Sequence, residues 1–523
     1  MKYAFLCFFS LLFLACKNQD EKIKIKSKGP NVLIIFPDQL RRYSAGFWSE
    51  EPYKNLVVGK PDPVVTPNID RLAKNGVVFT NAISNFPLCS PYRGMLMSGL
   101  YPEQNGIWNN CRDNRDESLR DDIETIPSLF YKAGYNTSYF GKCHWLKNEP
   151  LFDMEGNYVG SKQPPGGHYV NVYDTYVPPG KSRHSIEYFY QSLKDEHYNP
   201  RVYSNDPFVI DGKKDGELYL PKTFSAKNEA EVIIDYLRNE RGQRDASKPF
   251  CAIWSMNPPH NPWDDANTDM DMLHKYYGTD NYEEVDGDLV VRDNVDLGVA
   301  DYARHYYANV SSADKYIGWV IKELEKMGEL DNTIIVFSSD HGEMLGSHGK
   351  TGKNVVELES LAIPFIVHWP KQIDKGVTDV LFSVPDILPT IMGLAGLQND
   401  VPTQIEGTNF ASLLLDKQPL VKKPEAVLIM LENSRGVLTD RYTLCVRKKS
   451  TSEDENLKTA ILDEAFLYDN VQDPYQLRKI KLENRPEESK KLLTHLGTLL
   501  RKTNDPWYQN NYLDYIINYQ KHN

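Results

Sequence analysis

The sequence predicts an α/β fold in which helices cover a parallel or mixed sheet. Four short apolar runs lack alternation, as is typical of strands buried on both faces: 32–36, 137–140, 250–254 and 334–337. Stretches with helix signals lie between them. One begins at Thr66-Pro67 and closes at Gly76, and a longer one covers 301–327 before Gly328. Strands that alternate with helices favour an open sheet, whose ligands bind beyond the carboxyl ends of the strands.

The N-terminus reads as an export signal. A positive charge at Lys2 precedes the apolar stretch 3–15, which is too short for a bilayer span of about 20 residues. Cys16 follows directly and resembles the lipidated cysteine of bacterial lipoproteins. We therefore predict a lipoprotein signal peptide over 1–16 and a membrane anchor at Cys16, with the protein in the bacterial envelope (periplasm or outer membrane). The alternative is an ordinary signal peptide.

Three further segments complete the predicted organisation. Residues 17–29 are polar and form a tether, and residues 30–400 form the large domain. A break near 397–410 follows a helix that ends at Gly396. Beyond it, four short strands (426–431, 436–439, 442–446, 465–468) precede a helix over 486–501. We predict a smaller antiparallel sheet plus helix over residues 401–523.

Charge and cysteine usage narrow the function. The net charge of −12, with no basic run beyond 22–28, argues against a nucleic-acid partner. An anionic ligand would need positive charge gathered in a pocket. Without Cys7 and Cys16, five of the seven cysteines remain and none has C-x-x-C spacing. Neither a disulfide framework nor a zinc site is indicated, so a cysteine is available for chemistry.

Acidic and polar side chains follow two of the predicted strands. Asp38 and Gln39 end the first strand, and Asp340 and His341 end the last. Carboxylate and amide oxygens with one imidazole suit a hard cation. The sequence therefore predicts a Ca²⁺ site, with Mg²⁺ as the less favoured ion.

Positive side chains follow the other strands. Lys142 and His144 come after the second strand and His260 after the third, while Arg93 and Lys353 lie in loops or helices nearby. Cations around a small tetrahedral oxyanion, together with a metal, equip a site for sulfuryl or phosphoryl transfer.

The nucleophile comes from the segment around Cys89. It reads Cys89-Ser-Pro-Tyr-Arg93, which is C-x-P-x-R, and continues as L-x-S-G through Gly99. This segment resembles the signature of the type I sulfatases, the formylglycine-dependent family of the alkaline phosphatase superfamily. The resemblance implies that Cys89 is oxidised to formylglycine by a formylglycine-generating or sulfatase-maturating enzyme. It also implies a large alkaline-phosphatase-like mixed sheet between helices.

Most of the chain after Pro30 shares the resemblance. Further segments that match the family are 31–38, 66–73, 141–145, 258–262, 339–343, 352–364, 467–469 and 473–475. Two positions depart from the family pattern: Gln39 replaces an Asp found in many members, and Cys143 replaces a Trp. The segment 156–221 is rich in Tyr, Gly and Pro, lacks the strand pattern and resembles insertions that shape substrate pockets.

The resemblance also implies a role for each site residue. The metal is held by Asp38, Gln39, Asp340, His341 and the modified Cys89. Arg93 steadies the nucleophile and His144 bonds its hydroxyls. Sulfate is gripped by Lys142, Lys353 and His260. His260 is the predicted general acid, ahead of His144, because an alkoxide is a poor leaving group.

The function expected from these residues is hydrolysis of sulfate esters on a sulfated polysaccharide or oligosaccharide, such as an algal glycan or a glycosaminoglycan. Two alternatives remain open. A phosphodiesterase or phosphonate monoester hydrolase would use a similar nucleophile and metal. An inactive glycan-binding lipoprotein would be expected to lose Cys89 or a metal carboxylate, and all of these are present.

Overall fold

The computed structural model describes residues 29–112, 115–147, 174–193, 197–278, 301–415, 422–449 and 462–509. Cys16, the predicted signal peptide and the tether up to residue 28 lie outside the described residues. Within these ranges, no helix combines the length and the apolar character that crossing a membrane requires.

A nine-stranded mixed sheet forms the centre of the molecule, in the order β10-β2-β9-β8-β1-β7-β4-β5-β6. The strands are β1 (Asn31–Asp38), β2 (Val77–Phe79), β4 (Asn136–Gly141), β5 (Tyr188–Ser192), β6 (Val202–Ser204), β7 (Phe250–Pro259), β8 (Thr333–Phe337), β9 (Ile366–His368) and β10 (Gly376–Thr378). The four predicted strands are β1, β4, β7 and β8. They are neighbours and pair in parallel, so their carboxyl ends meet at one edge of the sheet.

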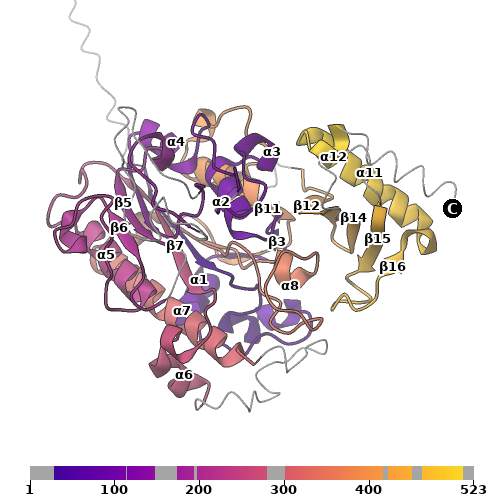
Figure 1. Cartoon of the computed structure of the whole chain (residues 1–523), viewed down its shortest axis with the longest axis horizontal. Helices are drawn as coiled ribbons and strands as arrows, with labels where there is room; N and C mark the ends of the chain where they lie inside the picture. The colour runs from indigo at the N-terminus through magenta and orange to yellow at the C-terminus, as the bar shows by residue number, and fades with distance from the viewer. Residues whose placement is uncertain are drawn as a thin grey trace, which may run out of the picture.

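Helices cover both faces of this sheet, as predicted (Figure 1). Alternate residues of β1 show why: Val32 and Ile34 join one apolar core, and Leu33 and Ile35 join the other. The first core is covered by α2 (Cys89–Ser98), α4 (Ile126–Lys132) and α9 (Ile387–Leu394). The second is covered by α1 (Pro67–Asn75), α5 (Ser225–Arg238), α6 (Met270–Tyr276) and α7 (Ala303–Lys326). The remaining short helices are α3 (Pro102–Asn105), α8 (Leu358–Leu361), α10 (Ala411–Leu415) and α12 (Pro506–Gln509).

Helix α1 shows how the sequence sets a boundary. Thr66 precedes Pro67 at the first helical position, and the helix ends before Gly76. A Cβ at Gly76 would lie 2.5 Å from the carbonyl oxygen of Val367, so only glycine allows the chain to pass β9 this closely. The turn then leads directly into β2.

The C-terminal part is a second, five-stranded antiparallel sheet, as predicted. Its strands are β12 (Val427–Leu431), β13 (Ser434–Leu438), β14 (Tyr442–Lys448), β15 (Leu462–Asp469) and β16 (Ile480–Lys481). Leu428 shares an apolar core with Leu496 of α11 (Pro486–Lys502), whereas Ile429 packs on the other face against Ile83 of the small strand β3 (Ala82–Ile83), which pairs with β11 (Phe382–Ser383). The side-chain amide of Asn85 donates to the Leu428 carbonyl at 2.8 Å and ties this sheet to the main body.

One sequence interpretation was wrong. The segment 156–221 was expected to lack strands, yet β5 and β6 come from it and extend the main sheet at its edge. In β5, Tyr188 and Tyr190 lie in one apolar core and Phe189 in the other, so the tyrosines serve as buried strand residues. Residues 156–173 and 194–196 of this segment lie outside the described residues.

Candidate active site

Cys89 is the first residue of α2 and is almost completely buried. Its Sγ lies 3.4 Å from His341 Nε2 and 3.8 Å from Asp38 Oδ1. The amino-terminal end of a helix favours negative charge at this position. Burial opposes ionisation of the thiol, but the charges of Lys142 and Lys353 outweigh it and hold the Cys89 pKa well below its usual range. The site is therefore built to stabilise an anionic atom at this side chain.

A compact group of ligand atoms surrounds that side chain. Atoms of Asp38, Cys89, Asp340 and His341 all lie within 4.8 Å of one another, and all four residues are buried. Burial and the neighbouring Asp38 charge raise the pKa of Asp340 above its usual range. The two carboxylates thus repel each other in a place without bulk water, and a bound cation would relieve this repulsion.

The ring of His341 is oriented for a ligand role. Its Nδ1 lies 3.0 Å from the carbonyl oxygen of Gly342, to which it donates as the protonated nitrogen. Its Nε2 faces the carboxylates, 3.6 Å from Asp340 Oδ2 and 3.7 Å from Asp38 Oδ1. Nε2 therefore points into the acidic group. Burial opposes protonation of the ring, but the Asp340 charge outweighs it and raises the pKa of His341 above its usual value.

Gln39 is held in one orientation by its neighbours. Its backbone adopts a left-handed conformation (φ 68°), and its side-chain oxygen accepts a hydrogen bond from Lys353. Its side-chain nitrogen donates to Glu343, which also accepts from the Tyr302 hydroxyl at 2.6 Å. Glu343 is not among the residues proposed from sequence. Its position two residues after His341, in the segment that follows β8, could have indicated a role at the site.

Arg93 and Lys142 both reach the carboxylates. The Arg93 Nη2 lies 3.0 Å from Asp38 Oδ2 and 3.3 Å from Asp340 Oδ2, and its Nη1 donates to the Lys142 carbonyl at 3.0 Å. Lys142 forms a buried ion pair with Asp38. Two cations therefore balance the negative charge of the two carboxylates.

The two histidines beside Cys89 differ in their proton positions. His144 Nε2 lies 3.0 Å from the Cys111 carbonyl and must donate to it, so the buried Nδ1 is the acceptor nitrogen; the ring also interacts with the Cys89 side chain. His260 Nδ1 donates to the Asn261 carbonyl at 2.8 Å, which leaves Nε2 beside Cys89. Burial and the Lys353 charge lower the pKa of His260 to about 3.

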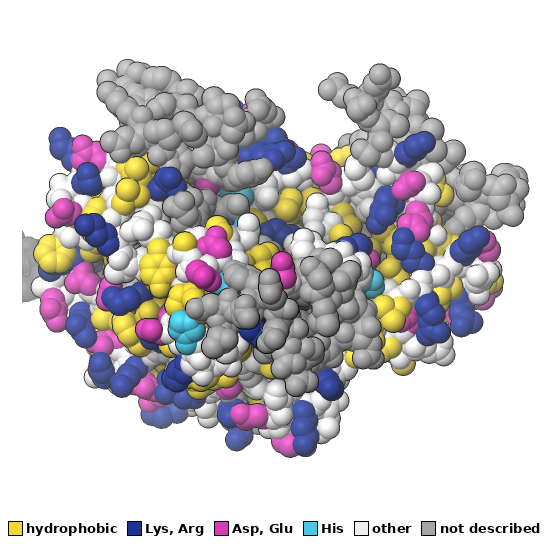
Figure 2. All heavy atoms as spheres, turned by 60° about the horizontal axis from the view of Figure 1, so that its bottom comes forward, with side chains coloured by type: hydrophobic (Ala, Val, Ile, Leu, Met, Phe, Trp, Pro, Cys, Tyr) yellow, Lys and Arg dark blue, Asp and Glu magenta, His cyan; other side chains and the backbone are white. Residues whose placement is uncertain are grey.

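All the residues proposed from sequence therefore gather at one edge of the sheet, at the ends of β1, β4, β7 and β8 and the start of α2. They are Asp38, Gln39, Cys89, Arg93, Lys142, His144, His260, Asp340, His341 and Lys353. On the outer face in Figure 2, by contrast, basic and acidic side chains are interspersed without one large basic patch. At the site, the positive charges of Arg93 and Lys142 are buried beside the carboxylates.

Comparisons with known proteins identify the family of this chain. Residues 30–397 match the sulfatase family model. The chain belongs to the sulfatase family. Residues 346–505 also match the model described as the C-terminal part of N-sulphoglucosamine sulphohydrolase.

Similar proteins extend over nearly the whole chain. An endo-4-O-sulfatase of Bacteroides thetaiotaomicron is 36% identical over 95% of this chain and 97% of its own length. An ulvan-active sulfatase of Formosa agariphila is 29% identical over 89% of this chain and 80% of its own. A solved sulfatase structure from a study of glycosaminoglycan metabolism in B. thetaiotaomicron has a TM-score of 0.83 and 36% identity, and covers 93% of this chain and 99% of its own. The protein is therefore a sulfate ester hydrolase. The comparisons favour the sulfatase prediction over the phosphodiesterase alternative.

Proposed function

We propose that this sulfatase removes sulfate esters from a sulfated polysaccharide or oligosaccharide, using a formylglycine made from Cys89 and a bound Ca²⁺. The observation that carries this proposal is the position of Cys89. It begins α2 and lies with two carboxylates and an imidazole in one group of atoms within 4.8 Å.

The donor set fits a calcium ion. Asp38, Gln39, Asp340 and His341 would hold it, together with an oxygen at position 89. Most of these donors are oxygen atoms, and Ca²⁺ accepts such a set with more freedom of geometry than Mg²⁺. When bound, the cation would lower the pKa of a neighbouring hydroxyl and offset the charge of the sulfate. It would also relieve the repulsion between Asp38 and Asp340.

Cys89 Sγ marks the position that the hydroxyls of a hydrated formylglycine would take. When present, that group would supply one hydroxyl as the nucleophile and a second whose deprotonation releases sulfate. His144 is suited to take that second proton, because its buried Nδ1 is an acceptor. Arg93 fixes the nucleophile's surroundings by bonding both carboxylates.

Recognition of sulfate falls to Lys142, Lys353 and His260. Both lysines already act on Cys89 electrostatically, so a sulfate group there would lie between two positive charges. His260 presents Nε2 at the same place, and a bound anion would favour its protonated form. We therefore assign it the proton donated to the departing sugar oxygen.

The relatives suggest the sugar position. The similarity to an endo-4-O-sulfatase over almost the full length supports a sulfate on a 4-hydroxyl within a glycan chain. The second relative acts on ulvan by its name, so an algal glycan is the competing substrate. A panel of glycosaminoglycan and ulvan oligosaccharides, with each product's desulfated position determined by NMR, separates the two.

We also propose export and lipid anchoring at Cys16 in the bacterial envelope. The support is the sequence alone: an apolar stretch that ends directly before a cysteine. The full chain made in a bacterium should appear in the membrane fraction with a lipidated N-terminal peptide, and Cys16→Ala should lose both. Recovery of wild-type protein without lipid would contradict the proposal.

The formylglycine step has a direct test. The protein should be produced with and without a sulfatase-maturating or formylglycine-generating enzyme, and the peptide containing Cys89 weighed by mass spectrometry. We expect this peptide to be lighter than its thiol form only in the active preparation, since oxygen replaces sulfur. Full activity with an unmodified thiol would overturn the mechanism, and Cys89→Ala provides the inactive control.

A further inference from the structure

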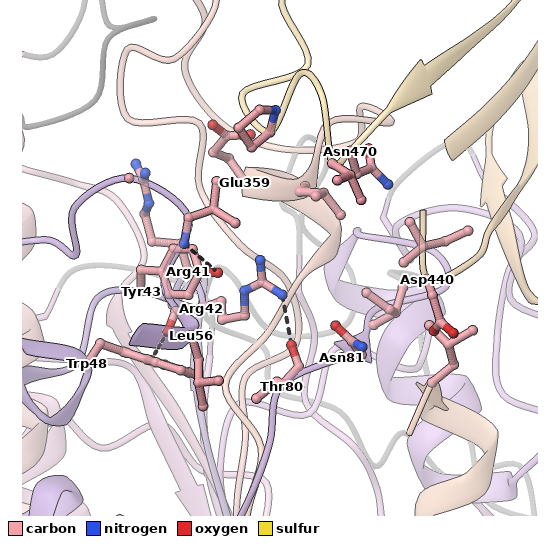
Figure 3. A pocket seen from close by; sticks show the side chains of 18 of the residues that line it. Arg41, Arg42, Tyr43, Trp48, Leu56, Thr80, Asn81, Glu359, Asp440 and Asn470 are labelled. Carbon is pink, nitrogen blue, oxygen red and sulfur yellow. Dashed lines mark hydrogen bonds between the residues drawn. The ribbon is translucent and has the colours of Figure 1, made fainter. Parts of the chain in front are cut away.

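A cavity opens beside the sheet edge that carries the active site. It has a volume of about 530 Å³ and lies between the loops after β1 and β2, helix α8 and two loops of the C-terminal sheet (Figure 3). None of the candidate active-site residues lines it. The cavity is therefore a separate feature of the molecule, although it shares the loop that follows β1.

Arg42 is the central polar group of this cavity. Its Nη1 donates to the Thr80 carbonyl at 2.8 Å, and its guanidinium lies over the Tyr43 ring at 4.4 Å. The Trp48 indole fixes its backbone by donating to the Arg42 carbonyl at 2.7 Å. Figure 3 shows this side chain reaching into the middle of the cavity. The guanidinium is thus held in place before any ligand arrives.

One edge of that guanidinium is unused. The Arg42 Nε is buried and has no hydrogen-bond partner, and no carboxylate pairs with Arg42 among the described residues. The neighbouring Arg41 is different, because its Nε forms an ion pair with Asp62 at 3.2 Å. The Nε and Nη2 edge of an arginine matches the two oxygens of a carboxylate or sulfate. Arg42 therefore offers the cavity a guanidinium that is held in place and has no carboxylate partner among the described residues.

The opposite walls restrict the class of anion. The carboxylates of Glu359 and Asp440 also line the cavity, and Asp440 forms no ion pair in the part of the chain described. A simple inorganic anion would meet their negative charge. A sugar that carries one oxyanion would instead place that group on Arg42 and offer hydroxyl donors to the acids. Asn81 and Thr439 add further polar groups to the lining.

We propose that this cavity binds an anionic sugar residue, a uronate or a sulfated sugar, of the same glycan that the active site desulfates. This inference rests on the proposed glycan substrate. Gln39 and Arg42 are three residues apart, so their Cα atoms are separated by at most about 11 Å. A glycan chain held at Arg42 is therefore kept close to Gln39 and the candidate metal site. This increases the local concentration of its sulfate esters at the active site.

Binding measured without turnover tests the proposal. Sulfated hexasaccharides should be titrated calorimetrically into Cys89→Ala and into Cys89→Ala with Arg42→Gln. We expect affinity to fall about 10-fold or more, because a charged bidentate contact is lost. Arg42→Lys should recover little, since it keeps the charge but not the fork. Arg71→Gln, which removes an exposed arginine from α1, is the matched control and should bind as the parent does.

Two oligosaccharide sets identify the oxyanion, one with carboxylates and no sulfate and one with sulfates and no carboxylate. A loss of affinity with either set supports the proposal and names the group. Equal affinity of the Arg42 variants and parent for both sets overturns it, provided that their melting temperatures agree. In the otherwise native enzyme, Arg42→Gln should raise KM for the glycan and leave nitrophenyl sulfate kinetics unchanged. Failure of the native enzyme to desulfate any glycan would refute the proposed function. The titrations would still show whether the cavity binds an anionic sugar through Arg42.

Discussion

Replacing His260 separates proton donation from sulfate binding. The imidazole is buried, and its Nδ1 is fixed on the Asn261 carbonyl at 2.8 Å, so the ring cannot turn without losing that bond. Its Nε2 consequently stays beside Cys89, where the ester oxygen of a substrate would lie. A sugar alkoxide needs a proton as it leaves, whereas a nitrophenolate does not.

The expected effect therefore depends on the leaving group. His260→Ala should lower kcat for a sulfated oligosaccharide by about 10²–10⁴-fold, the usual contribution of general acid catalysis. With nitrophenyl sulfate the loss should stay below about 10-fold, because only one of several sulfate contacts is removed. His144→Ala should slow both substrates alike, since its Nδ1 accepts protons and its Nε2 is committed to Cys111.

The assay compares the two substrates under single-turnover conditions for each variant. His495→Ala, a change on helix α11 far along the chain from the site, is the control and should behave as the native enzyme. An equal loss on both substrates after His260→Ala would show that His260 is only a sulfate ligand. The general-acid role would then pass to another group.

Three further changes test the surroundings of the site. Asp340→Ala, or exhaustive chelation of the native enzyme, should abolish turnover and calorimetric Ca²⁺ binding; retained binding would refute a shared metal site. Glu343→Gln should weaken Ca²⁺ binding about 10-fold, because the Gln39 amide loses its charged acceptor, and unchanged affinity would deny it this positioning role. Burial raises the pKa of Glu229 from 4.5 to about 7, so the native state holds the extra proton and stability falls as pH rises through this window. Glu229→Gln should therefore raise the free energy of unfolding more at pH 8 than at pH 5, by on the order of 3 kcal/mol, and an equal change at both pH values in denaturant titrations would contradict this.

The sequence predicted the centre of the molecule well because the central strands are buried on both faces. Their continuous apolar runs and abrupt polar ends are visible without any contact information, and their parallel pairing then places Asp38 and Asp340 together. Strand β5, which lies next to the edge strand β6, was missed because its aromatic residues also fit a pocket-lining insertion. The Lys142–Asp38 ion pair depends on how side chains from different strands meet, which no local pattern records.

Gln39 illustrates a feature that only the structure explains. An Asp at this position would place a third carboxylate in the acidic group and would pair with Lys353. The amide oxygen instead accepts one hydrogen bond, and no carboxylate forms an ion pair with Lys353 among the described residues. The negative charge lies on Glu343 instead, which accepts hydrogen bonds from the Gln39 amide nitrogen, the Tyr302 hydroxyl and the Leu345 backbone. In the proposed site, Gln39 would offer a neutral oxygen to the cation and would leave Lys353 without a carboxylate partner, so we expect this departure from the family pattern to favour anion binding.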